Sequence, residues 1–155
     1  MAALLLSTTV NKVDKKGRVS VPASFRTVLS AQGFNGVVLF RSISHPAVEG
    51  WSSDQMESLS KGIGSFNPFS EKRDDFAFSI LADATQLPFD PEGRILLPEK
   101  FLAHAKIGEN AAFVGLGQSF QIWDPATFEA LQDKARARAK DGKEELKLPN
   151  GGGAQ

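Results

Sequence analysis

A strand-like pattern of hydrophobic and polar positions occurs twice in the chain, and each copy ends at a proline. Residues 18–21 read Arg-Val-Ser-Val before Pro22, and residues 94–97 read Arg-Ile-Leu-Leu before Pro98. Alternation, which is clear in the first copy, predicts a strand. A proline suits the first position of a helix, where its missing N–H costs no hydrogen bond. We therefore expect each copy to form a strand that leads directly into a short helix.

The residues after each proline carry apolar side chains at helical spacing. They are Phe25, Val28 and Leu29 in the first copy, and Phe101, Leu102 and Ala105 in the second. This spacing places them on one face of a helix, which we expect to be buried. Gly33 and Gly108 follow the two segments and are expected to end the helices.

The residues before each strand match as well, so the chain contains an internal repeat. Both copies read Asp, two further residues, Gly and Arg, from Asp14 to Arg18 and again 76 positions later from Asp90 to Arg94. Asp can hydrogen-bond its own backbone and Gly accepts a positive φ, so the pattern predicts a tight loop before each strand. The match continues to Trp51 and Trp123 after a short insertion near 44–48.

The remaining elements follow from apolar runs and helix caps. Further strands are expected at 4–13, 36–40, 111–116 and 120–123, and a loop at 44–50. Helices are expected after the capping residues Ser52, Ser70 and Asp124. The Gly-, Asn-, Pro- and Ser-containing segment 62–70 separates the two repeats, and the polar, Gly-rich chain beyond Asp141 is expected to be disordered.

The composition favours one core shared by the two repeats. Each half has about forty to fifty ordered residues, a size at which an isolated core is marginal without disulfides or metal. The 155-residue chain has no cysteine. We expect an α+β fold, mainly β with short helices and interleaved strands. The expected parts are a first repeat at 5–61, a connecting segment with a helix at 62–83, a second repeat at 84–132, and a helix end with tail at 133–155.

Neither a membrane span nor a secretion signal is expected. No run approaches the roughly 20 apolar residues that cross a bilayer. The opening residues 1–6 are too few for a signal peptide and lack a basic start. The absence of cysteine fits a reducing compartment. We therefore expect a cytoplasmic location.

Positive charge is concentrated on the first copy of the motif, although the formal net charge of the chain is zero. Residues 9–41 contain six basic side chains against Asp14 alone: Lys12, Lys15, Lys16, Arg18, Arg26 and Arg41. Acidic residues outnumber basic ones in 42–84 and again in 85–125. A local basic cluster of this kind indicates an anion-binding face.

The chain contains two copies of the loop, each followed by a hydrophobic strand, Pro and an amphipathic helix. In this it resembles the MraZ family of bacterial transcriptional regulators, which belongs to the AbrB-like swapped-hairpin group. The segment Gln-Ile-Trp-Asp at 121–124 is similar to that family too, and the match covers roughly 5–131. The resemblance implies an intertwined β-barrel of double-psi type and a ring-like homo-oligomer. It also implies binding to tandem repeats upstream of the division and cell-wall genes, usually as a nucleoid-associated repressor.

The resemblance and the charge cluster together give the candidate site. The family's DNA-contacting arginines correspond to Arg18 and Arg94, and we expect Lys15 and Lys16 to contact phosphates, with Lys12 and Arg26 as flanking contacts. Asp14, Gly17, Asp90 and Gly93 are expected to set loop geometry. Pro91 and Glu92 stand where the first loop has lysines. A carboxylate repels phosphate, so the second loop is open to a structural interpretation.

Other interpretations remain open at this point. Arg18 could pair with Asp14 across the turn rather than contact DNA. The chain could be an oligomeric interaction module or antitoxin-like partner protein that uses the acidic and apolar segment 66–81. A self-processing enzyme could be imagined at Gly64-Ser65, but no base and oxyanion arrangement is legible, so we expect no enzyme. His45 and His104 lack further ligands, so neither a metal nor a cofactor is expected.

Overall fold

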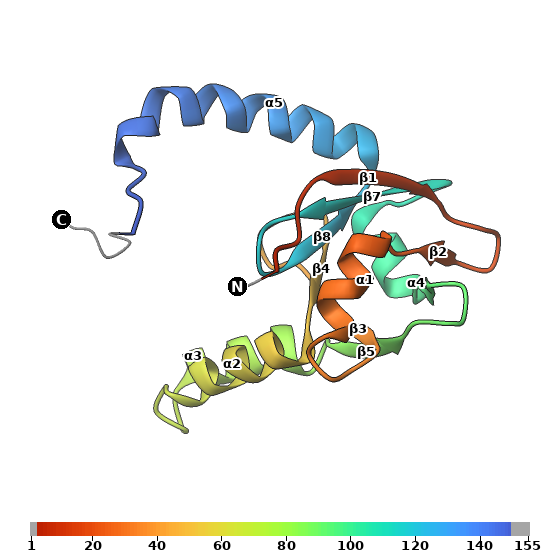
Figure 1. The fold of residues 1–155 in the computed structure, drawn as a ribbon. Coiled ribbons are helices and arrows are strands. Elements are labelled where there is room, and N and C mark those ends of the chain that lie inside the picture. Colours follow the sequence, from red (N-terminus) through yellow and green to blue (C-terminus); the bar gives the residue numbers. More distant parts are fainter. Residues whose placement is uncertain (1–2, 150–155) are drawn as a thin grey trace. The chain divides into compact units, whose positions relative to one another are not determined.

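The computed structural model describes residues 3–149 and divides the chain into two compact units, one up to Pro125 and one from Ala126. The first repeat contains β1 (Thr8–Lys12), β2 (Arg18–Ser20), α1 (Ala23–Ser30), β3 (Gly36–Arg41), β4 (Val48–Trp51) and α2 (Ser53–Gly64) (Figure 1). The second repeat contains β5 (Thr85–Pro88), β6 (Arg94–Leu96), α4 (Glu99–Ala105), β7 (Asn110–Gly115), β8 (Phe120–Trp123) and α5 (Pro125–Gly142). The order of elements is the same in both, as the repeated sequence predicts.

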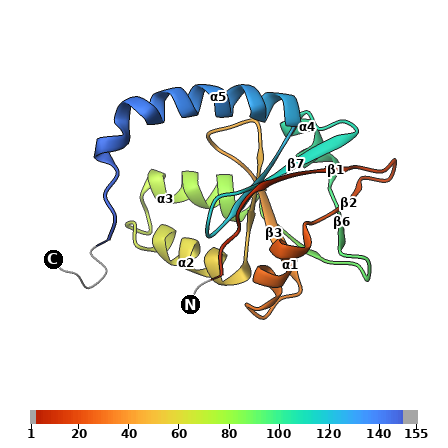
Figure 2. The ribbon, with the colours of Figure 1, turned by 45° about the horizontal axis from the view of Figure 1, so that its top comes forward.

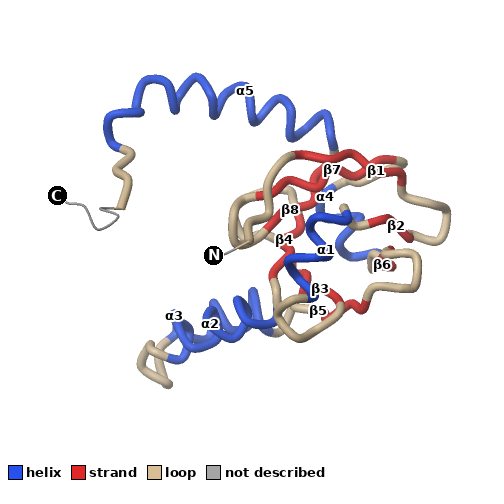
Figure 3. The backbone as a smooth tube through the Cα atoms, in the orientation of Figure 1, coloured by secondary structure: helices blue, strands red, loops and turns tan. Residues whose placement is uncertain are grey.

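The two repeats exchange their first strands. β1 pairs with β7, the third strand of the other repeat, and β5 pairs with β3 in the equivalent way. The strands β4 and β8 also pair, which gives a six-stranded antiparallel sheet in the order β1-β7-β8-β4-β3-β5. β2 and β6 form a separate two-stranded ribbon (Figure 3). The predicted α+β class is confirmed, and the ladders of residues 3–149 form these two sheets, so closure into a barrel stays a prediction.

One hydrophobic core lies between the elements of both repeats. The buried faces of α1 and α4 contribute Phe25, Leu29, Phe101 and Ala105, as expected, while Val28 and Leu102 are partly buried. The Phe25 and Phe120 ring centroids lie 5.2 Å apart. A Cβ on Gly50 would meet the Phe120 ring at 2.3 Å, so only glycine fits opposite this ring. Because each repeat supplies half of this core, neither could bury its apolar surface alone.

Three sequence-based expectations require correction. The expected loop at 44–50 contains the start of β4, whose residues Val48 and Gly50 are buried. The expected strand at 4–13 is shorter, with only isolated bridges at Leu5 and Val13. Helix α4 ends at Ala105 and is capped by Lys106 in the left-handed conformation (φ 52°), so it stops before Gly108. These bounds depend on strand pairing and on local backbone conformation, which the residue pattern does not specify.

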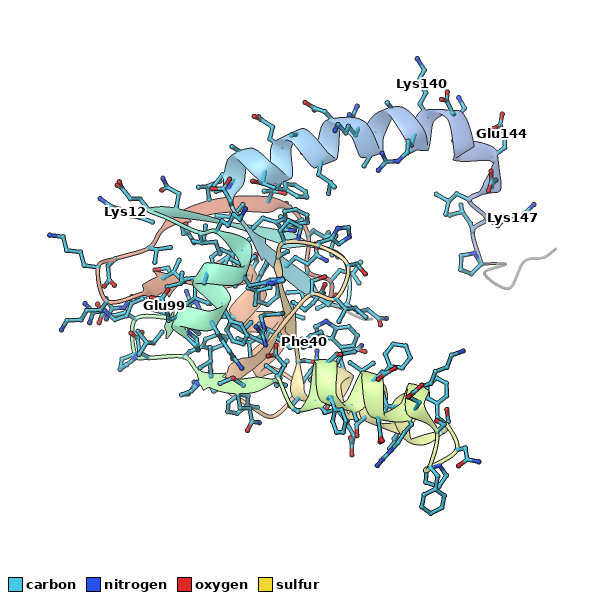
Figure 4. All side chains as sticks on the ribbon, turned by 180° about the vertical axis from the view of Figure 1, so that it is seen from behind. Lys12, Phe40, Glu99, Lys140, Glu144 and Lys147 are labelled. Carbon is cyan, nitrogen blue, oxygen red and sulfur yellow. The ribbon has the colours of Figure 1, made fainter. Side chains whose placement is uncertain are left out.

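Between the repeats the chain forms a helical pair that packs on the sheet near Phe40 (Figures 2 and 4). The pair is α2 and α3 (Glu71–Phe76), and α3 continues into a π-helical turn, η1 (Ala77–Leu81). The expected caps are present, since Ser52 Oγ accepts from the Gln55 N–H and Ser70 Oγ from the Arg73 N–H, both at 3.1 Å. Such caps satisfy N–H groups that a helix leaves unpaired.

The second unit is mainly α5, which begins at Pro125 as the Asp124-Pro125 pair predicts. The helix runs to Gly142 and a 3₁₀ turn, η2, follows at Lys143–Glu145, so regular structure extends beyond the expected limit at Asp141. The rest of the expected tail, 150–155, lies outside the described residues. None of the helices in 3–149 is long and apolar enough to cross a membrane.

A buried carboxylate fastens the end of η1 to the rest of its unit. Asp83 is 7% exposed and accepts hydrogen bonds from the Arg41 N–H at 2.8 Å and from Arg41 Nη2 at 2.7 Å. Lys100 Nζ donates to the Asp83 carbonyl at 2.9 Å. Burial alone would raise the pKa of Asp83, but the Arg41 hydrogen bonds and the nearby Lys100 charge outweigh it and hold the pKa below its ordinary value.

We expect Asp83→Asn to lower the free energy of unfolding at neutral pH by about 1 to 3 kcal/mol, because two cations lose a charged hydrogen-bond partner. The wild-type contribution is fully present above the ordinary carboxyl pKa of about 3.9 and is lost as pH falls through the lower folded value. Urea unfolding at several pH values measures this. Asp75→Asn, at an exposed position of α3, is the control, and an equal effect of both substitutions would contradict the assignment.

Candidate nucleic-acid interface

The first loop is a tight turn closed by its own aspartate. Asp14 Oδ1 accepts hydrogen bonds from the backbone N–H of Lys16 at 2.9 Å and of Arg18 at 2.8 Å. The Gly17 N–H donates to the Asp14 carbonyl at 3.0 Å, and Gly17 has φ 89°, which favours glycine. The backbone of the loop is therefore held at both ends while its tip, Lys15 and Lys16, stays exposed.

The second loop repeats this geometry. Asp90 Oδ1 accepts from the N–H groups of Glu92 and Arg94, both at 2.9 Å. The Gly93 N–H donates to the Asp90 carbonyl at 2.9 Å, and Gly93 has φ 79°. Asp14 and Asp90 thus make equivalent contacts, and each sets the shape of its loop.

The two loops are joined to each other by hydrogen bonds. The Gly17 carbonyl accepts from the Leu97 N–H at 2.9 Å, and the Gly93 carbonyl accepts from the Val21 N–H at 3.0 Å. Between them lies the β2–β6 ribbon, whose central pair, Val19 and Ile95, is buried in the core. Both loops consequently project at the same end of the first unit (Figure 1).

The outward face of the ribbon brings the two arginines together. Alternation along each strand leaves Arg18 and Ser20 of β2, and Arg94 and Leu96 of β6, on the side away from the core. Arg18 lies across the ribbon from Leu96, and Ser20 across from Arg94. Arg18, Leu96 and Arg94 line a hollow of about 490 Å³, with Leu87, Pro88, Asp90 and Pro98 completing its wall. Sequence analysis missed Leu96, which only the cross-strand register places beside the arginines.

Each arginine pairs with the aspartate of its own loop. Arg18 Nε lies 2.7 Å from Asp14 Oδ2, and Arg94 Nε lies 2.9 Å from Asp90 Oδ2. The salt bridge considered as an alternative role for Arg18 is therefore present. It uses only Nε, however, and within residues 3–149 neither Nη atom of Arg18 has a hydrogen-bond partner. The bridge orients the guanidinium and leaves its outer edge available.

The two loops differ in what surrounds their arginines. Arg94 Nη2 lies 3.0 Å from Glu92 Oε1, a contact that the first loop lacks because Lys16 occupies the equivalent position. The glycine turns also rest on different side chains. A Cβ at Gly17 would meet the Leu97 carbonyl first and then the Leu96 and Leu102 side chains, whereas the guanidinium of Arg26 lies directly against the backbone of Gly93.

The remaining predicted cations fall into three environments. Lys12 is exposed at the end of β1, in a hollow that it shares with Lys15 and Glu109 (Figure 4). Arg26 donates from Nε to the Val21 carbonyl at 3.1 Å, so it supports the second loop from α1. Arg41, which the sequence groups with this cluster, is engaged by Asp83 and does not belong to the loop face.

The hydrogen bonds inside the loops shift acid–base equilibria. The pKa of Asp14 lies below its ordinary value, chiefly because its carboxylate accepts from the Arg18 N–H. Burial opposes this shift, but the further hydrogen bonds from the Arg18 side chain and the Lys16 N–H keep the pKa lowered. The pKa of Asp90 is lowered in the same way by Arg94 and Glu92. The pKa of Arg94 is raised, first by its hydrogen bond to Asp90. The Asp90–Arg94 pair and the Asp14 carboxylate are therefore charged at neutral pH.

The histidines lie together but away from these loops. His104 Nε2 is 3.1 Å from the His45 carbonyl oxygen, and the His45 ring is tilted against Trp123. In the described part of the chain, no three His, Cys, Asp or Glu side chains form a group that could hold a metal ion.

We expect both loop carboxyl groups to titrate below pH 3.9, the ordinary aspartate value. The stabilisation they provide is present above that value and is lost as pH falls through the lower folded pKa. Carboxyl carbon chemical shifts of Asp14 and Asp90, followed by NMR during an acid titration, measure the two values. A midpoint at or above 3.9 for either residue would contradict the loop geometry.

The sequence is similar to a known family over nearly its whole length. The family model described as "MraZ protein, putative antitoxin-like" matches residues 4–77 and again residues 80–149. A protein of Pelagibacter ubique named "Transcriptional regulator MraZ" is 53% identical over 144 residues, 93% of each chain. Proteins of the same name from Gluconobacter oxydans and Rickettsia canadensis are 43% identical, covering 89% and 95% of this chain and 86% and 99% of their own.

These matches agree with the doubled loop and with the shared order of elements in the two repeats. The relatives are named as regulators of transcription, which agrees with the expectation that the chain is not an enzyme. The chain therefore belongs to the MraZ family.

Proposed function

We propose that the protein regulates transcription by binding duplex DNA sequence-specifically through the loop from Asp14 to Arg18. The observation that carries the proposal is the rigid presentation of three cations. Lys15 and Lys16 are exposed on a turn whose backbone is fixed by Asp14, and Arg18 is oriented with both Nη atoms free of protein partners within residues 3–149. A fixed array of this kind loses little entropy when it binds a polyanion.

The cations would divide the work of recognition. The major groove of B-DNA admits a two-stranded ribbon, and arginine donates two parallel hydrogen bonds to guanine, worth about 1 to 3 kcal/mol of discrimination. Arg18, at the start of such a ribbon, is our candidate for base recognition. Lys15 and Lys16 contact phosphates, which fixes register and supplies affinity. Lys12 is a flanking phosphate contact, and Arg26 acts mainly by holding the second loop.

One loop contacts few phosphates, so affinity must come from several subunits. Linked subunits on tandem sites raise the effective concentration for each further contact. We therefore propose that a ring-like homo-oligomer binds repeated sites upstream of the division and cell-wall genes, where it acts as a repressor. The chain's zero net charge supports this arrangement, since nonspecific attraction to DNA is weak outside the loop face.

A second function is supported by exposed aromatic side chains on the helical pair. Phe69 is 95% exposed where α2 and α3 join, and Phe78 of η1 is 68% exposed. Large apolar side chains left exposed to solvent are typical of protein-binding surfaces when they form a patch. The α2–α3 pair could therefore bind a partner protein, and such binding would be insensitive to salt and to loss of Arg18.

We expect Arg18→Ala to abolish the preference of the protein for tandem upstream repeats over a scrambled duplex. Lys16→Ala should reduce the slope of log affinity against log salt by about 0.9 or less for each engaged subunit, because one phosphate contact is lost. Fluorescence anisotropy with the two duplexes, over a range of salt concentrations, measures both effects.

Arg73→Ala is the matched control, since it removes an exposed arginine whose partner is Asp74 on α3. Its binding should equal that of the wild type. If wild-type protein bound both duplexes alike and Arg18→Ala changed nothing, the DNA-binding function of the first loop would be refuted.

A further inference from the structure

The second loop carries a carboxylate that is positioned against its own arginine. Glu92 Oε1 lies 3.0 Å from Arg94 Nη2, and Asp90 Oδ2 lies 2.9 Å from Arg94 Nε. Two of the three guanidinium nitrogens of Arg94 thus face carboxylates. In the first loop only Nε of Arg18 does so. The two arginines have the same backbone setting but not the same free hydrogen-bonding edge.

The charge of the two loops differs in the same sense. The first loop has Lys15, Lys16 and Arg18 against a single carboxylate. The second has Arg94 alone against two carboxylates, because Pro91 and Glu92 replace the lysines. The residues of the second loop itself therefore carry a net negative charge, which the Arg26 guanidinium beside Gly93 balances, whereas the first loop is positive. The difference at position 92, glutamate in place of lysine, accounts for two of the three units of charge.

The backbone fixes Glu92 in this position. The Glu92 N–H is held at 2.9 Å by Asp90 Oδ1, and the Gly93 N–H closes the turn on the Asp90 carbonyl. Pro91 restricts φ at the second position of the turn, which suits proline. Glu92 therefore leaves the turn on a rigid backbone two residues before Arg94. The side chain is 72% exposed, so it also lies where DNA would approach.

We propose that Glu92 is a specificity-determining residue that keeps the second loop off DNA by occupying the free edge of Arg94. The inference rests on the proposed DNA-binding function. It makes the two loops unequal: the first loop contacts DNA, and the second, which has the same backbone, serves as its structural counterpart through the β2–β6 ribbon.

This role has a consequence that a purely structural role would not have. If Glu92 masks Arg94, then removing its charge restores the arrangement of the first loop, because the Asp90–Arg94 pair matches the Asp14–Arg18 pair. DNA binding should then become stronger. Most substitutions in a binding protein weaken binding, so a gain that depends on Arg94 is a distinctive result.

The experiment compares wild type with Glu92→Gln, Glu92→Lys, Arg94→Ala and Glu92→Gln/Arg94→Ala, on the tandem-repeat duplex and on a scrambled duplex of equal length. We expect Glu92→Gln to raise affinity about fivefold to tenfold per engaged loop near 0.1 M salt and to increase the salt slope by up to about 0.9 per loop. Glu92→Lys should increase both further. Arg94→Ala serves as the background for the double variant, which should bind no more tightly than Arg94→Ala alone.

Glu99→Gln is the matched control, because it removes the same charge from an exposed position at the start of α4 without any contact to Arg94 (Figure 4). Equal gains for Glu92→Gln and Glu99→Gln would overturn the proposal, as would a gain that persists without Arg94. Circular dichroism establishes that each variant is folded. Loss of DNA preference in Arg18→Ala tests the proposed function separately, so the two ideas can fail independently.

Discussion

The reciprocal hydrogen bonds between the two loops are the constraint on which the rest of the structure depends. Each glycine carbonyl accepts from the residue that follows the strand of the other repeat, so the position of each loop is fixed relative to the other. The same contact buries Val19 and Ile95 against the shared core. A backbone carbonyl left unpaired at such a buried position would cost free energy. The core therefore fixes where the loops lie, while the aspartate of each loop fixes its turn.

The aspartates of the two loops also determine how the nearby arginines are oriented. The aspartate of each turn accepts from backbone N–H groups and also pairs with the arginine four residues later. One side chain therefore sets both the backbone of the turn and the orientation of the arginine. The chain's other prominent carboxylate, Asp83, uses the same chemistry at a buried site and withdraws Arg41 from the basic face. Position relative to a carboxylate, rather than the number of cations, decides which arginine is available to a ligand.

The repeat made much of this predictable from sequence. The loop motif, the short helices after the prolines and the caps at Ser52 and Ser70 depend on local residues, and these predictions are confirmed. The prolines, however, stand one position earlier than expected, at the N-cap of each helix and not at its first helical residue. The exchange of β1 and β5 and the pairing of Arg41 with Asp83 join distant segments, which periodicity does not specify. The start of strand β4 was predicted as a loop because glycine is typical of loops. Here Gly50 lies in the strand because only glycine fits against the Phe120 ring. The contact between Glu92 and Arg94 could not be predicted either, because it depends on where the two side chains lie.

Because both repeats belong to one chain, the end of the molecule that carries the two loops is asymmetric. In a symmetric pair of identical chains every substitution would appear on both sides of the axis. Here the two halves belong to one chain, so position 16 can hold lysine while its counterpart, position 92, holds glutamate. The exchanged strands β1 and β5 pair in equivalent ways, yet the two loops carry different side chains. The two loops of one subunit are therefore not interchangeable. A subunit turned so that its loops exchange places would present different side chains to the same ligand.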